Sequence, residues 1–76
     1  MPSYLVTLTN ATFRSSSEYE YDDDKHAIED SVKGAINVGA AEVCGGEALF
    51  IAEIRIERDG NMIARRAVAV GSSPLS

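Results

Sequence analysis

The chain has 76 residues, of which 45% are hydrophobic and 25% charged, and its formal net charge is −5 at pH 7. This length allows a single domain, and the composition is typical of a folded globular domain rather than a disordered chain. The acidic balance argues against a nucleic-acid partner, because affinity for phosphates rests on lysine and arginine. No apolar run approaches the ~20 residues of a membrane span, so we expect no membrane partner.

The N-terminal third predicts two short strands. Apolar and polar residues alternate over residues 3–9, which is the pattern of a strand with one buried face. A polar turn region follows at residues 10–17, and a second strand is predicted near residues 18–22, where Tyr19 and Tyr21 share one face. Packing in the core or on the sheet explains the tyrosines better than base stacking does, since glutamates alternate with them and would repel phosphates.

A long helix is predicted next. Asp22, Asp23 and Asp24 favour a helix start, because aspartate is a good N-cap and acidic residues suit the positive end of the helix dipole. Two glycines at residues 45–46 favour its end. The helix either runs unbroken or breaks near Gly39, since each internal glycine costs about 1 kcal/mol relative to alanine. One apolar stripe at helical spacing is expected to face the sheet: Ile28, Val32, Ala35, Ile36, Gly39 and Val43.

Residues 48–70 predict a β-hairpin closed by Asp59-Gly60. We favour a type I turn with Gly60 in the left-handed position, which pairs Glu57 with Asn61 and sets Glu53 opposite Arg65. A two-residue Asp-Gly loop is the alternative, and it would shift the pairing by one.

The predicted fold is therefore α+β, with the order β-β-α-β-β. We expect two layers, in which one helix covers one face of a four-stranded antiparallel sheet. Residues 1–70 form the single domain, and residues 71–76 form a flexible C-terminal tail. The strand order stays open, because both hairpins are local and either can occupy the centre of the sheet.

The apolar surface exceeds what one chain of this layout can bury. One helix is about 10 to 12 Å wide and a four-stranded sheet about 15 to 19 Å, so part of the sheet stays uncovered. A strip of small helix residues would also let another backbone approach closely. We therefore expect a homo-oligomer, most simply a two-fold dimer, with contacts on the helix strip or the outer sheet face. These contacts are Ala27, Ser31, Gly34, Val38 and Ala41 on the helix, and Leu5, Leu49, Ile51 and Ile63 on the sheet.

The chemistry-bearing residues do not form a recognisable active site. Cys44 and His26 lie about 27 Å apart along a continuous helix, whereas a nucleophile and its base need about 3 Å. Cys44 is expected to fill space at the helix end. A structural zinc site needs four ligands, and an EF-hand starting at Asp22 would place Ala27 where glycine is required. We therefore predict no enzymatic activity, no catalytic residues, no metal and no cofactor.

The chain resembles a family of short bacterial proteins of unknown function over about residues 3–70. The residues that carry this resemblance are the strand at Tyr4, the acidic run followed by Ala27-Ile28, and the hairpin turn Asp59-Gly60. The resemblance implies the β-β-α-β-β fold and no activity. A fainter similarity to antitoxin-type small domains lacks the Gly-Cys step before the helix that such domains would show.

The leading functional hypothesis is a non-enzymatic, self-associating interaction module. The alternatives are a small domain that binds a ligand or a divalent ion, and an acidic regulator that occupies a basic protein as antitoxins do. The N-terminus lacks the basic start and apolar core of a signal peptide, and the single cysteine excludes an internal disulfide, so we expect a cytoplasmic protein.

Overall fold

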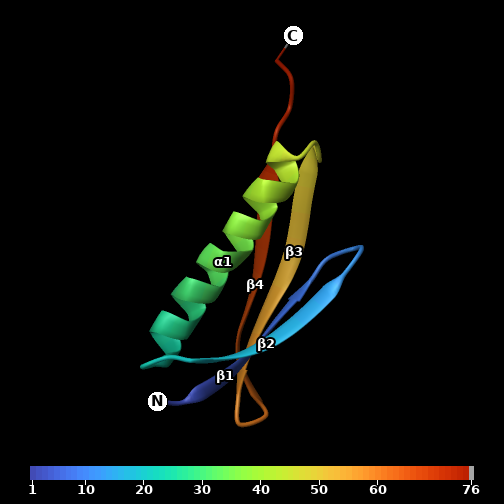
Figure 1. Cartoon of the computed structure of the whole chain (residues 1–76). Helices are drawn as coiled ribbons and strands as arrows, with labels where there is room; N and C mark the ends of the chain where they lie inside the picture. Colours follow the sequence, from blue (N-terminus) through green and yellow to red (C-terminus); the bar gives the residue numbers. More distant parts are fainter. Residues whose placement is uncertain (76) are drawn as a thin grey trace.

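One helix packs on one face of an open, four-stranded antiparallel sheet in the computed structural model, which describes residues 1–75 (Figure 1). The sheet order is β2-β1-β3-β4, and the helix connects β2 to β3. The predicted α+β class and the order β-β-α-β-β are confirmed. The elements are β1 (Ser3–Thr9), β2 (Arg14–Glu20), α1 (Asp24–Cys44), β3 (Leu49–Arg58) and β4 (Asn61–Gly71).

Helix α1 begins where the aspartates predicted it. The Asp23 side chain accepts a hydrogen bond of 2.8 Å from the backbone N–H of His26, which satisfies one of the free amides of the first turn. The helix is continuous to Cys44, so the chain does not break near Gly39. Gly45 caps the other end, and Gly46 follows in the left-handed region with a φ of 119°.

The buried face of α1 shares only Ala35 and Gly39 with the predicted stripe. Its buried residues are the small ones, Ala27, Ser31, Ala35 and Gly39, whereas Ile36 of the predicted stripe is 45% exposed. The physical reason is that the sheet supplies the bulk of the core, so small residues bring the helix backbone close to it. Ile28 and Val32 remain half-buried beside this contact and pack against the core.

Strand β2 is longer at its start than predicted, because the turn before it is short. The Asn10 side chain accepts hydrogen bonds of 2.9 Å from the backbone N–H groups of both Thr12 and Phe13, which holds the chain in a tight reversal. Pairing with β1 then starts at Arg14, opposite Thr9. The residues from 14 to 17, predicted as turn, are therefore strand.

The β3–β4 hairpin forms with a different register from the favoured one. Asp59 and Gly60 both have positive φ, 53° and 79°, which makes a two-residue turn of the mirror-image type that suits the twist of a hairpin. Arg58 consequently pairs with Asn61, and a bulge at Ile56/Glu57 shifts the rest of the ladder. The type I turn was the wrong choice because the two-residue loop matches the strand twist.

The ion pair between Glu53 and Arg65 forms despite the shifted register. Glu53 lies opposite Ala67 in the ladder, so the two charged side chains meet diagonally. The proximity of the guanidinium lowers the pKa of the Glu53 carboxyl.

The start of α1 is tied to the sheet by a buried tyrosine. The Tyr4 hydroxyl donates a 2.8 Å hydrogen bond to Asp24 Oδ1, which also forms an ion pair with Arg58 at the end of β3. The Arg58 guanidinium lies 5.9 Å from the centre of the Tyr4 ring. This group fixes one end of the helix on β1 and β3.

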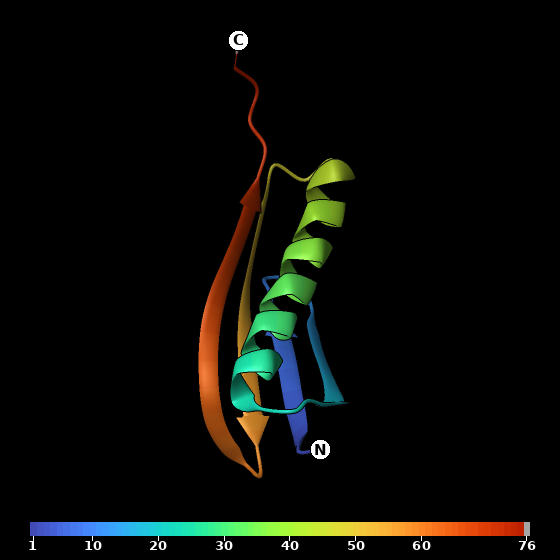
Figure 2. The ribbon, with the colours of Figure 1, turned by 90° about the vertical axis from the view of Figure 1, so that its left-hand side faces the viewer.

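Helix α1 covers only half of its sheet face. It packs mainly against β3 and β4, and the β1–β2 hairpin diverges from it, as the two views of the ribbon show (Figures 1 and 2). Within residues 1–75, no helix is long and apolar enough to cross a membrane. Gly71, which we placed in the flexible tail, is the last residue of β4, and Ser76 lies outside the described residues.

Candidate interaction surface

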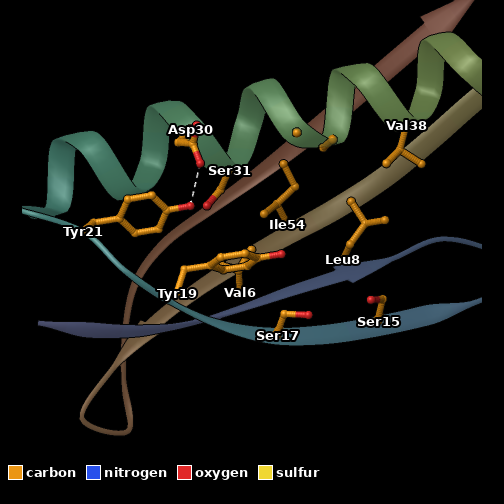
Figure 3. A pocket seen from close by; sticks show the side chains of 12 residues that line it. Val6, Leu8, Ser15, Ser17, Tyr19, Tyr21, Asp30, Ser31, Val38 and Ile54 are labelled. Atoms are coloured by element: carbon orange, nitrogen blue, oxygen red, sulfur yellow. Dashed lines mark hydrogen bonds between the residues drawn. The ribbon is translucent and has the colours of Figure 1, made fainter.

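A groove lies between α1 and the uncovered β1–β2 half of the sheet (Figure 3). The groove is open to solvent along one side and has a volume of about 290 Å³. Its apolar lining consists of Val6 and Leu8 from β1, Ile54 from β3, and Ala35 and Val38 from the helix. The groove follows directly from the narrow helix contact, since one helix cannot cover four strands.

One end of the groove is polar. The Tyr21 hydroxyl donates a 2.7 Å hydrogen bond to Asp30 Oδ2. Burial raises the pKa of Tyr21 to about 12, and the hydrogen bond to the Asp30 carboxylate acts in the same direction. The nearby Ser31 hydroxyl acts in the opposite direction and lowers the pKa of Tyr21. The Ser31 oxygen has no hydrogen-bond partner among residues 1–75, although Ser31 is only 8% exposed.

Aromatic rings and hydroxyls continue the groove along β2. The Tyr19 ring is 48% exposed, and its centre lies 6.1 Å from that of Tyr21. Ser15 and Ser17 line the same side of the strand (Figure 3). Among the lining residues Asp30 carries the one ionised side chain, and they include no lysine, arginine or histidine.

The buried Tyr21 phenol makes stability fall at alkaline pH. Its pKa is raised from 10.0 to about 12 in the folded chain, so its stabilising effect is fully present below pH 10 and is lost as the pH rises toward 12. We expect the wild type to lose more unfolding free energy than Tyr21→Phe between about pH 8 and about pH 11, measured by urea denaturation. Equal losses in the two proteins would contradict a buried, neutral Tyr21.

The second feature of this side of the molecule is the free edge of the sheet. Strand β2 pairs with β1 alone, and all seven of its residues are exposed. An edge strand offers unpaired backbone donors and acceptors to another strand. The charged side chains of β2 lie near its ends, with Arg14 at the first position and Glu18 and Glu20 toward the last.

The predicted helix contacts divide into two groups. Ala27 and Ser31 are buried against the chain's own sheet, so they are not available to a partner. Gly34, Val38 and Ala41 are exposed on the groove side or beyond it. The close approach expected of small residues therefore occurs within the chain.

The predicted sheet contacts do not form one contiguous patch. Leu5 lies opposite Glu57, and Ile51 is six residues further along β3, which is about 20 Å in a strand. Leu49 and Ile51 are exposed and lie near the β1–β2 turn. Ile63 is half-buried and packs against the core. The outer face is thus a mixed surface rather than an apolar one.

The chemistry-bearing residues have structural positions. Cys44 is exposed at the end of α1, so the prediction that it fills space there is wrong. Asp23 caps the helix, and Asp24 binds Tyr4 and Arg58. The part of the chain that the structure describes contains no cluster of three or more residues placed to hold a metal ion.

Comparison with known proteins adds no relative: no family model, curated protein or solved structure matches the chain. The resemblance to a family of short bacterial proteins therefore stays a prediction.

Sequence reasoning missed the residues that define this surface. Arg14 falls within the turn region predicted over residues 10–17, and no predicted site includes Asp30. A signal for the edge was present, because Arg14-Ser-Ser-Ser-Glu18-Tyr-Glu20 carries opposite charges at its two ends. Its meaning depends on knowing that the strand starts at Arg14.

Proposed function

We propose that this protein is a non-enzymatic interaction module that acts as a homodimer, joined by antiparallel pairing of two β2 strands. The observation that carries the proposal is the free β2 edge, fully exposed along its seven residues. Adding a strand to such an edge is a common mode of association, since backbone hydrogen bonds supply the contact. The product is a two-fold dimer with a continuous eight-stranded sheet.

The side chains of β2 are complementary to themselves in this arrangement. A two-fold axis at Ser17 pairs all seven residues of the strand, and it sets Arg14 of each copy opposite Glu20 of the other. Ser15 then lies opposite Tyr19, and Ser16 opposite Glu18. Opposite charges facing each other across strands contribute roughly 0.2–1 kcal/mol per pair, and this dimer contains two such pairs.

The other edge of the sheet is unsuited to the same pairing. Strand β4 carries Arg65 and Arg66 at its centre, so a two-fold axis there would bring arginines of both copies together. Central charges of one sign are a common means of preventing edge-to-edge association. The charge pattern therefore favours β2.

A single pair of seven-residue strands makes a small interface. Interfaces below about 1,200 Å² belong to weak or transient complexes, so we expect a dissociation constant in the micromolar range. Sedimentation equilibrium from about 1 μM to about 500 μM should show a reversible change from one chain of 8.1 kDa to two. A single species of monomer mass over that whole range would overturn the proposal.

We also propose that the protein is cytoplasmic, and this location and the lack of enzymatic activity have separate support. Cys44 and His26 lie at opposite ends of the continuous helix, so they cannot act as a nucleophile and its base in one chain. A single exposed cysteine suits a reducing compartment, where such a thiol stays free of disulfides.

A further inference from the structure

We infer that the groove between α1 and the β1–β2 hairpin binds a small amphipathic ammonium compound, with its apolar body along β1 and its ammonium group at Asp30. This inference goes beyond the proposed dimer, because every residue that it uses belongs to one chain. The groove and the edge are also tested by different measurements, so either can fail alone.

The size and lining of the groove suit a compact apolar body. Its volume of about 290 Å³ is near the lower end of the range for ligand pockets. Val6, Leu8 and Ile54 form an aliphatic floor, and Gly34 leaves the helix side open, since a Cβ built there meets nothing within 4 Å. A single aromatic ring or a short branched chain can therefore lie between helix and sheet.

The polar end suits a cation. Asp30 carries the negative charge, and no basic side chain among the lining residues competes for it. One oxygen of its carboxylate accepts from Tyr21, and the other is not engaged in any hydrogen bond within the described residues. The Tyr21 ring stands beside it, and the centre of the Tyr19 ring lies 6.1 Å from that of Tyr21. Aromatic rings attract ammonium groups through their negative faces.

An unpartnered hydroxyl gives independent support for a ligand. Ser31 is more than nine-tenths buried, lines the groove, and its oxygen lacks a hydrogen-bond partner. A buried polar atom without a partner is costly, so native structures normally satisfy such atoms. The Ser31 side chain extends from the helix toward the Tyr21 hydroxyl at the polar end of the groove (Figure 3). Its oxygen is covered there, so a bound ammonium group must displace this cover before its N–H can donate to the oxygen.

The test compares three probes of one shape. The ¹⁵N-labelled protein is titrated with 2-phenylethylamine, phenylacetate and 2-phenylethanol, and backbone amide shifts are followed by NMR. We expect the amine to shift residues near 15–19 and 30–35 with a dissociation constant in the millimolar range, which suits so small a ligand. Phenylacetate should bind at least about tenfold more weakly, because Asp30 repels it.

Two variants and one control separate the effect of the Asp30 charge from the effect of the free volume in the groove. Asp30→Asn keeps an acceptor for Tyr21 and removes the charge, so it should weaken amine binding about tenfold, while Glu29→Gln should leave binding unchanged. Gly34→Leu should block all three probes by occupying the groove. Equal affinity for the amine and phenylacetate, an unchanged affinity in Asp30→Asn, or unchanged binding in Gly34→Leu would each overturn the inference.

Discussion

Replacing Ile54 with alanine is expected to lower the free energy of unfolding by about 3 kcal/mol. Ile54 is 0% exposed at the centre of the core, between the helix and the sheet. Removing a buried isoleucine to alanine costs about 2–5 kcal/mol, because apolar contact is lost and a cavity remains. A domain of this size has a total stability of roughly 4 to 10 kcal/mol, so this one change removes a large fraction of it.

The matched control is Ile36→Ala on the outer side of the helix. Ile36 is 45% exposed, so its truncation should cost less than about 1 kcal/mol. Urea denaturation followed by circular dichroism at the helix signal gives both values. A loss at Ile36 equal to that at Ile54 would mean that the helix presents its large apolar stripe to the sheet after all.

The two internal glycines of α1 are expected to respond to alanine with opposite signs. A Cβ at Gly39 would lie 2.7 Å from Phe50 Cδ1 and 2.8 Å from Val70 Cγ2, so these side chains must move. Overpacking of this kind costs about 1–3 kcal/mol, which exceeds the gain of about 1 kcal/mol in helix propensity. Gly39→Ala should therefore destabilise the protein by up to about 2 kcal/mol.

Gly34→Ala is the control in the same helix. A Cβ there meets no atom within 4 Å, so only the propensity gain remains and the variant should be more stable by up to about 1 kcal/mol. Thermal and urea unfolding of both variants measure the two shifts. Stabilisation by both substitutions would show that Gly39 does not lie against β3 and β4.

Local sequence signals were sufficient to predict the number and the order of the helix and strands. Three aspartates start the helix, two glycines end it, and Asp59-Gly60 closes the last hairpin where the sequence predicted it. These signals act within a few residues through capping and turn geometry, so they can be read without knowing the rest of the chain.

The packing face of the helix could not be predicted in the same way. Hydropathy favoured a stripe that includes Ala35, Ile36 and Gly39, yet Ile36 is exposed, and Ala27 and Ser31 are buried beside the other two. The large side chains of the sheet, among them Tyr4 and Ile54, fill the core and leave room only for small residues opposite. The buried face therefore combines residues of both predicted stripes, because it depends on the volume supplied by the other layer, which periodicity does not report.

The candidate site depended on two long-range facts. The strand order β2-β1-β3-β4 puts β2 at an edge, and a helix crossing β3 and β4 leaves β1 and β2 uncovered. Neither the order nor the crossing follows from local patterns. The shifted register of the β3–β4 hairpin is a similar case, since a single bulge moves every pair beyond it.

The most direct test of the proposed dimer mixes two charge-reversed chains. In a dimer of Arg14→Glu chains, a glutamate of one copy lies opposite a glutamate of the other, and in a dimer of Glu20→Arg chains an arginine lies opposite an arginine. The dissociation constant of each variant dimer should therefore be at least about tenfold higher than that of the wild type. An equimolar mixture of the two restores both opposite-charge pairs across a Ser17-centred axis. Sedimentation equilibrium should show a heterodimer in the mixture and largely monomers in each variant alone. Wild-type association in both single variants, or no heterodimer in the mixture, would contradict the pairing of β2 edges.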